Sequence, residues 1–110
     1  MYYRIRMSVK PVFKLSVSKL PTKKYAVSYI NPKTGRVNTI QFGDKNYFDY
    51  TTSGGDKEMR RLYLIRHKND SKTDMTTAGF WAHWLLWSRP TLAGAIDEIE
   101  RMFNIDIQTE

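Results

Sequence analysis

Apolar and polar residues alternate along much of the first half of the chain. The alternation runs through residues 2–9, stops at Pro11 and resumes over residues 13–18. A period of two puts successive side chains on opposite faces, so both stretches are typical of β-strands. They also fit an extended arm that gains order only on a partner, because terminal segments are ordered only where other contacts hold them. We predict a basic, strand-like arm over residues 1–22, followed by one compact domain over residues 23–110.

The clearest alternation flanks a turn at residues 31–35. Tyr25, Val27 and Tyr29 occupy alternate positions of residues 24–30, and residues 36–42 return with the same period. Within the turn, Pro32 fixes φ and Gly35 supplies a positive φ. These features predict a β-hairpin with a loop of about five residues. A hairpin alone is only marginally stable in water, so its apolar face needs a covering layer.

Helical spacing replaces the alternation after the glycine pair at residues 54–55. Asp56 precedes a stretch in which Met59, Leu62 and Tyr63 share one helical face. Acidic residues at the start of this stretch favour the positive end of the helix dipole. The pattern predicts a helix that begins near Asp56 and ends near residues 68–70.

Three tryptophans fall within residues 81–87, directly after Phe80. On a helix capped by Thr77, Phe80, Trp84 and Trp87 form one row of a wide apolar arc, which is typical of a central helix packed on more than one side. Glycine lowers helix stability, so Gly79 is expected to let another backbone come close. The predicted core comprises Phe80, Trp81, Trp84, Leu85, Trp87, Ile96, Ile99 and Phe103.

Thr91 and Asn104 bracket a further helix over residues 92–103. The helix before it ends at Arg89, since a residue that precedes proline avoids the helical region. Asn104 suits the left-handed conformation of a C-terminal cap, and Ile105 and Ile107 then alternate as a short strand. Together the elements predict an α+β fold, in which a small antiparallel sheet built on the hairpin packs against about three helices, with the tryptophan-rich helix in the middle.

The tryptophan run has two other interpretations besides core. Exposed aromatic side chains among basic residues form stacking platforms for single-stranded bases. Here the tryptophans and most basic residues lie in different segments of the chain, which disfavours such a platform. A groove for a protein partner is the second interpretation, because tryptophan, tyrosine and arginine dominate interface hot spots.

The distribution of charge along the chain adds the prediction of an anionic partner. The chain of 110 residues carries a net charge of +7, with ten Lys or Arg and two Asp or Glu in residues 1–50, but one and five in residues 91–110. A basic front suits nucleic acid or an acidic protein surface, although solubility alone also explains it. The candidate partner- or nucleic-acid-binding residues are Arg4, Arg6, Lys10, Lys14, Lys23, Lys24, Arg60, Arg61, Arg66 and Lys68.

Candidate catalytic and metal-binding residues are few. The chain has no cysteine, which excludes disulfides and thiolate metal sites, and no apolar stretch long enough to span a membrane. His67 with Asp70 and Asp74 matches no common metal-ligand spacing, and His83 is expected to be a core or helix-edge histidine. A nuclease-like acidic cluster is a remote alternative. We predict no enzyme activity, no cofactor and no metal site; the acidic cluster would comprise Asp44, Asp49, Asp56 and Glu58.

Several motifs occur in a fixed order along the chain: Phe42-Gly43, Asp49-Tyr50-Thr51, Arg61-x-Tyr63-x-x-Arg66-His67-Lys68, the run from Thr77 to Trp87, and Pro90-Thr91-Leu92. Together they resemble a small uncharacterised family of nucleocytoplasmic large DNA viruses, such as iridovirus-, mimivirus- and phycodnavirus-like viruses. The resemblance covers roughly residues 24–107 and leaves out residues 1–20. It implies a viral origin and a compact α+β module, and it implies no particular activity.

Two functions are expected from the sequence. The first is a structural virion protein, a minor capsid or shell-lining component found in the virion and in the host cytoplasm during assembly. Its basic arm would dock on other virion or capsid proteins, for instance by adding a strand to a neighbouring sheet. The second is binding of DNA or RNA through the basic N-terminal half and the helix that carries Arg60 and Lys68. The sequence leaves the oligomeric state open.

Overall fold

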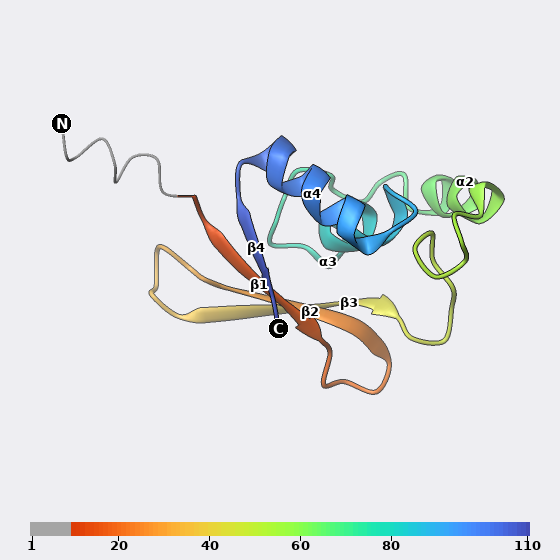
Figure 1. Cartoon of the computed structure of the whole chain (residues 1–110). Helices are drawn as coiled ribbons and strands as arrows, with labels where there is room; N and C mark the ends of the chain where they lie inside the picture. Colours follow the sequence, from red (N-terminus) through yellow and green to blue (C-terminus); the bar gives the residue numbers. More distant parts are fainter. Residues whose placement is uncertain (1–9) are drawn as a thin grey trace.

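Four strands and three helical segments form two layers in the part of the chain that the computed structural model describes, residues 10–110 (Figure 1). The strand predicted over residues 2–9 lies outside these residues, as do Arg4 and Arg6. The helices cover one face of the sheet and leave the other face open. No helix of residues 10–110 is long and apolar enough to cross a bilayer. The α+β class predicted from the sequence is confirmed.

The sheet has the strand order β3-β2-β1-β4. Strands β2 (Lys23–Ile30) and β3 (Val37–Asp44) form the predicted hairpin, and β1 (Val12–Val17) pairs antiparallel with β2. The last strand, β4 (Asp106–Thr109), runs parallel to β1, so the sheet is mixed where an antiparallel one was expected. The chain reaches β4 only after passing through all the helices, and such a crossover returns it in the parallel direction.

Strand β1 changes the boundary between the expected arm and the domain. It is hydrogen-bonded to β2 on one side and to β4 on the other, and its Phe13 and Leu15 are buried. A strand paired along both edges has no free edge to offer a partner. Residues 12–17 therefore belong to the compact domain, and only residues that precede β1 could serve as a docking arm.

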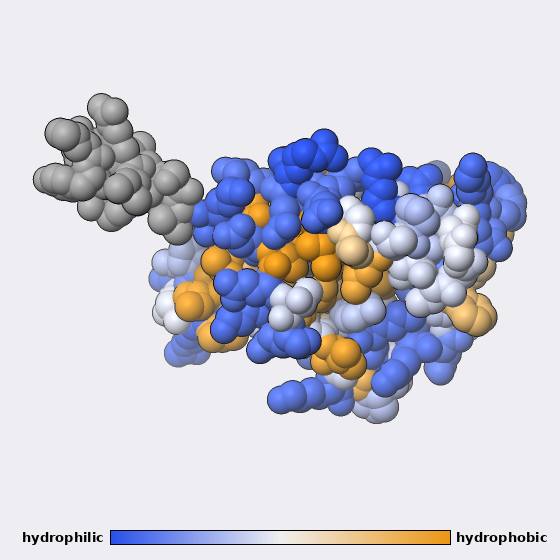
Figure 2. Space-filling model, viewed as in Figure 1, coloured by the Kyte–Doolittle hydropathy of each residue, from blue (hydrophilic) through white to orange (hydrophobic). Residues whose placement is uncertain are grey.

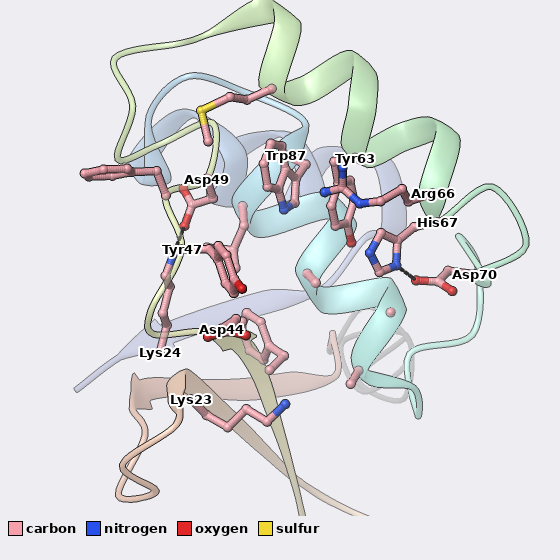
Figure 3. A pocket seen from close by; sticks show the side chains of 18 of the residues that line it. Lys23, Lys24, Asp44, Tyr47, Asp49, Tyr63, Arg66, His67, Asp70 and Trp87 are labelled. Carbon is pink, nitrogen blue, oxygen red and sulfur yellow. Dashed lines mark hydrogen bonds and ion pairs between the residues drawn. The ribbon is translucent and has the colours of Figure 1, made fainter.

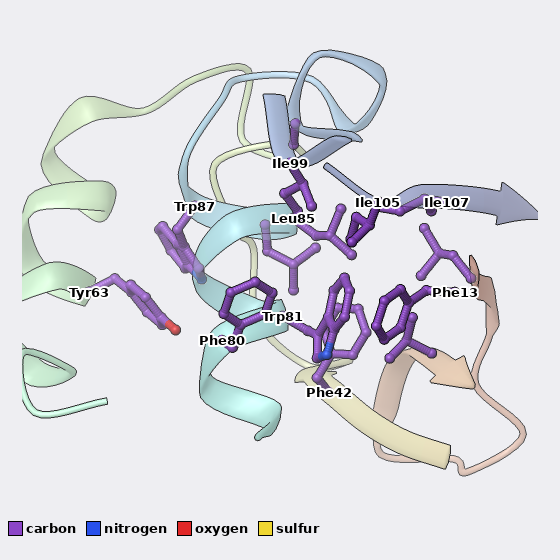
Figure 4. Packing of buried hydrophobic residues seen from close by; sticks show 14 residues of the cluster. Phe13, Phe42, Tyr63, Phe80, Trp81, Leu85, Trp87, Ile99, Ile105 and Ile107 are labelled. Atoms are coloured by element: carbon purple, nitrogen blue, oxygen red, sulfur yellow. The ribbon is translucent and has the colours of Figure 1, made fainter. Parts of the chain in front are cut away.

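The core lies between the sheet and the helical layer (Figure 4). Period-two alternation turns Phe13, Val27 and Phe42 toward the helices, where they meet Trp81 and other helical side chains. Trp81 is fully buried, and its ring centroid lies 5.2 Å from that of Phe13. Polar residues such as Lys14, Ser28 and Thr39 occupy the alternate positions, which face away from this core.

The tryptophan run is one continuous helical segment of two types. Helix α3 (Ala78–Trp81) begins at Thr77, whose hydroxyl accepts from Phe80 N, and η1 (Ala82–Trp87) continues as a π-helix. The wider turn of a π-helix changes the predicted row of Phe80, Trp84 and Trp87. Trp84 packs on Phe103, whereas Trp87 stacks on Tyr63. The two tryptophans therefore belong to different environments.

The flanking helices follow their sequence signals closely. Helix α2 (Lys57–Arg66) starts at Asp56, whose carboxylate caps Glu58 N and Met59 N. Helix α4 (Leu92–Phe103) starts at Thr91 and ends at Asn104, which adopts the expected left-handed conformation with φ of 55°.

The predicted core positions are all in or against the apolar cluster. Five of them are buried: Phe80, Trp81, Leu85, Trp87 and Ile99. The other three, Trp84, Ile96 and Phe103, are partly buried and pack against the same cluster. The face of the molecule shown in Figure 2 is mostly hydrophilic, and apolar residues show between α4 and the sheet.

Candidate functional site: an aromatic pocket beside helix α2

A pocket of about 570 Å³ opens between the end of β3, the loop over residues 44–50, helix α2 and the helix α3/η1 (Figure 3). Pockets that hold small molecules typically measure about 300–1,000 Å³. The η1 residues Ala82, Leu86 and Trp87 line one wall, so the π-helix contributes directly to the pocket. Such π-turns occur often at functional sites.

Three stacked rings form the wall that α2 shares with η1. Tyr63 stacks on Trp87 with ring centroids 4.3 Å apart and planes 7° apart, and its other face stacks on His67 at 4.2 Å. Tyr63 and Trp87 are each only 7% exposed. Because each ring is held on its broad face, the ring edges are left to face the pocket.

Two polar groups on these edges have no protein partner within residues 10–110. The indole N–H of Trp87 and the hydroxyl of Tyr63 make no hydrogen bond, and both point into the hollow in Figure 3. Burial raises the pKa of Tyr63 to about 12, with Asp70 adding to the shift, so the hydroxyl keeps its proton at neutral pH. Within residues 10–110 the buried side-chain polar atom that lacks a partner is His83 Nδ1, so solvent in the pocket reaches these two donors and leaves them free to meet a ligand.

The loop over residues 44–50 is anchored by the buried carboxylate of Asp49. Asp49 accepts from Lys24 Nζ at 2.5 Å, and its other oxygen accepts from Thr51 N and Thr52 N. Tyr50 N donates to Leu86 O, which ties the loop to η1. The loop is anchored in this way, while the two side chains just before Asp49 lie outside the core.

Tyr47 and Phe48 project from this loop and are 69% and 66% exposed. Both residues line the main pocket and also a second hollow of about 230 Å³, which Lys45 lines as well. They therefore form an aromatic ridge, defined here as Tyr47 and Phe48, between the two hollows. An exposed pair of aromatic side chains on an anchored loop is a surface suited to stacking.

Basic side chains flank the aromatic ridge. Lys23 and Arg66 line the main pocket, and neither makes an ion pair within residues 10–110. Of the acidic residues in the lining, Asp49 is held by Lys24 and Asp70 by His67 Nδ1 at 2.9 Å, which leaves Asp44. The lining thus holds three cations and three carboxylates, and Lys23 and Arg66 are its cations without an ion pair within residues 10–110.

The position of Asp70 also explains why residue 79 is a glycine. A side chain at Gly79 would bring its Cβ within 3.0–3.1 Å of the Asp70 side chain. The expected close approach is therefore to a carboxylate side chain and not to another backbone. Gly79 makes room for the His67–Asp70 pair at the pocket wall.

The structure divides the predicted binding residues among several places. Lys23, Lys24 and Arg66 meet at the pocket, although Lys24 is committed to Asp49. Lys10 and Lys68 are exposed and do not line the pocket, and Lys14 lies on the open face of the sheet.

Two predicted anion contacts on α2 are engaged in the protein itself. Arg60 Nε donates to Trp87 O at 2.7 Å, and its guanidinium lies 5.6 Å from the ring centre of Tyr50. Arg61 pairs with Glu58 on the exposed side of the helix. Arg60 is therefore a structural residue in this arrangement, because it caps a carbonyl of η1.

The acidic and histidine clusters considered from the sequence do not assemble. Asp49 is buried with Lys24, Asp56 caps α2, and Glu58 pairs with Arg61. No group of three or more potential metal ligands occurs within residues 10–110. His83 is buried with an unpaired Nδ1, and burial lowers its pKa to about 4.

Sequence reasoning missed the pocket because its parts are far apart along the chain. Tyr63 and Trp87 each fit an apolar helix face in the sequence, and no periodic pattern covers the aromatic ridge. The local signal was present in Tyr47 and Phe48, two large aromatic residues in a segment without periodicity. Their position across a pocket from Arg66 follows only from the tertiary structure, in which Tyr63 of α2 stacks on Trp87 of η1.

Comparisons with known proteins place the chain in a family without assigning it an activity. No curated protein and no solved structure matches the chain. Residues 13–67, half of the chain, match a family described as one of unknown function, DUF5754. This segment runs from β1 to the end of α2, so it includes the residues before position 24 and stops short of the tryptophan run. It contains the aromatic ridge and Tyr63, and the chain belongs to this family of unknown function, DUF5754.

Proposed function

We propose that this protein is a non-enzymatic binding protein for single-stranded nucleic acid, which lies across the aromatic ridge and the pocket mouth. The observation that carries the proposal is the exposure of Tyr47 and Phe48 between Lys23 and Arg66 on one side and Lys45 on the other. Bases of any sequence stack on such rings, at about 1–3 kcal/mol each, while neighbouring cations follow the phosphates. The exposed rings are those of the aromatic ridge, whereas Trp81 and Trp87 of the tryptophan run are buried.

Direct binding of fluorescent oligonucleotides tests the proposal. A Tyr47→Ala, Phe48→Ala double variant should lose at least tenfold in affinity, since each stacked base contributes about 1–3 kcal/mol. The matched control is Ile30→Ala, Val37→Ala, which removes two similarly exposed apolar residues at the far end of the hairpin. Equal affinities for these two variants would reject the aromatic ridge as the binding surface.

Salt dependence tests the contribution of the cations. For single strands the slope of log K against log salt is about −0.7 for each phosphate contact. Lys23→Gln, Arg66→Gln should therefore make the slope shallower by about 1.4. Lys33→Gln, Arg36→Gln in the hairpin loop should leave the slope unchanged, because these residues lie away from the ridge. A slope that responds equally to both pairs would indicate charge without a defined site.

A second function, as a structural component of a large DNA virus, is supported by the motifs between Phe42 and Leu92 that resemble proteins of such viruses. In this proposal the protein lines the shell and contacts other virion or capsid proteins, with residues before β1 as the docking arm. The virion and the assembling host cytoplasm are the corresponding locations. Mass spectrometry of purified particles tests it, and absence of the protein from them would reject it.

A further inference from the structure

The main pocket has unused hydrogen-bond donors in a wall that is otherwise closed. Tyr63 and Trp87 are more than nine-tenths buried, yet the hydroxyl of one and the indole N–H of the other have no protein acceptor within residues 10–110. An indole N–H can only donate, and Tyr63 remains protonated at neutral pH because its pKa is about 12. The complementary ligand therefore presents hydrogen-bond acceptors to this wall.

The other walls of the pocket are largely apolar, so the part of the ligand that fills the pocket should be flat and largely apolar. Phe42, Met59 and Leu86 line the pocket together with Tyr47 of the aromatic ridge. A volume of about 570 Å³ lies within the range of small-molecule sites and is ample for one nucleoside. Apolar walls with a few directed polar groups are the usual arrangement of a pocket that orients a planar ring.

The mouth of the pocket adds an anion requirement. Lys23 and Arg66 line the pocket on opposite sides in Figure 3, without ion-pair partners within residues 10–110, and an arginine fork matches the oxygens of a phosphate. The Asp70 carboxylate is held by His67, so it does not compete for Arg66 in this arrangement. An aromatic ring with edge acceptors and an attached phosphate meets all three requirements.

We infer that the pocket binds one nucleotide unit, with a carbonyl-bearing base against Trp87 and Tyr63 and its phosphate at either Lys23 or Arg66. This inference rests on the proposed function and deepens it, because the unit is either a free mononucleotide or one nucleotide of the bound strand. Uracil presents two ring carbonyls and is the simplest base of this class. Binding in the pocket therefore favours bases with ring carbonyls, whereas stacking on the aromatic ridge alone favours no particular base.

Calorimetric titration with uridine monophosphate, octauridylate and phenyl phosphate tests the inference. Phenyl phosphate has the ring and the phosphate but no acceptor on the ring. Trp87→Phe and Tyr63→Phe each remove one donor while they keep an aromatic ring in the stack. Each should weaken uridine monophosphate about three- to tenfold, the usual range for one hydrogen bond, and leave phenyl phosphate unchanged.

Trp84→Phe is the matched control. Its indole N–H donates to Lys72 O at 2.9 Å, and Trp84 does not line the pocket. It should bind all three probes as the wild type does, and far-ultraviolet circular dichroism should show that each variant is folded. Equal weakening of uridine monophosphate by Trp84→Phe and Trp87→Phe would overturn the inference.

The two sources of the nucleotide give different results. If octauridylate binds more tightly than the monophosphate and both weaken with Trp87→Phe, the pocket holds one nucleotide of a strand. If the monophosphate binds as tightly as octauridylate, the pocket inference is confirmed and the proposed binding of single-stranded nucleic acid is wrong. If octauridylate binds and neither donor variant changes its affinity, the strand function holds and the pocket inference is wrong. If no uridine probe binds, both are wrong.

Discussion

Trp81 and Trp84 at one end of the tryptophan-rich helix differ from Trp87 at the other end in what their indole N–H groups contact. Trp81 donates to Met75 O at 2.8 Å, and Trp84 donates to Lys72 O at 2.9 Å. Trp87 has no acceptor within residues 10–110 and lines a pocket with its ring edge. All three residues bury most of their surface, so burial alone does not distinguish core from site.

The difference shows where this helix changes its role. Its first part closes the space between the sheet and α4, and the indole N–H groups of Trp81 and Trp84 are both hydrogen-bonded there. Its last turn contacts α2, where Tyr63 is likewise a buried ring whose polar group has no protein partner within residues 10–110. Solvent in the pocket reaches both groups, since the buried side-chain atom without a partner within residues 10–110 is His83 Nδ1, and both are therefore available to a ligand.

The largest expected effect separates the core end from the site. Trp81→Ala should lower the free energy of unfolding by about 3–5 kcal/mol, because it leaves a cavity where the side chain is fully buried against Phe13 and Phe80. Tyr47→Ala on the exposed ridge should change it little. Denaturant unfolding measures both, and a comparable loss for Tyr47→Ala would show that the ridge is structural.

The anchoring of the pocket loop should have the next largest effect. Asp49→Ala should lower the free energy of unfolding by about 3 kcal/mol, because it leaves the Lys24 charge buried and unpaired and removes the acceptor for Thr51 N and Thr52 N. The control Glu58→Ala breaks an exposed pair with Arg61 and should change stability little. Similar stabilities for the two variants would contradict the anchoring role of Asp49.

His83, between the two ends, should make stability depend on pH. Burial lowers its pKa from 6.5 to about 4, with Lys72 and Arg60 lowering it further and Asp70 opposing them. A histidine with a depressed folded-state pKa stabilises the fold above pH 6.5, and this contribution is lost as pH falls toward 4. The loss amounts to about 3 kcal/mol for a shift of this size.

Chemical unfolding of wild type and His83→Leu from pH 7 to pH 4 measures this effect. The wild type should lose more stability over that range than the variant, because only the wild type gains a proton at this position on unfolding. The same slope in both proteins would show that His83 is already accessible to protons in the folded state.

The smallest expected effect tests the comparison directly. Trp84→Phe leaves Lys72 O without its donor and should lower stability by about 1–2 kcal/mol. Trp87→Phe removes a group that has no acceptor, so its cost should be limited to lost ring area. Thermal unfolding of the two variants side by side measures the difference, and a larger loss for Trp87→Phe would mean that its N–H is satisfied in the apo protein.

Much of the secondary structure was predictable because its signals are local. Pro32 and Gly35 specified the hairpin turn, Thr91 and Asn104 marked both ends of α4, and Asp56 marked the start of α2. Each of these residues acts on backbone groups within a few positions of itself. The parallel pairing of β4 with β1 was not predictable in this way, because it joins the two ends of the described chain.

The candidate site was predictable only in part. Charge identified Lys23 and Arg66, and composition identified the aromatic residues, but neither showed that Tyr47, Tyr63 and Trp87 converge. The π-helix η1 was a further obstacle, because a regular α-helix would have put Trp84 and Trp87 in one row. The same limit explains Arg60, whose basic side chain looks free in sequence and caps Trp87 O in the fold.

The amino-acid sequence by itself determined the α+β class, the hairpin, the starts of the helices and a core that includes the tryptophan-rich helix, since periodicity and capping residues act locally. Only the tertiary structure decided that β1 lies inside the sheet, that Arg60 is engaged, and that aromatic and basic residues meet at one pocket. Contacts between distant segments depend on how whole elements pack. The unused donors of Tyr63 and Trp87 are a property of that packing, because a hydrogen bond exists or is missing only once the neighbouring elements are in place.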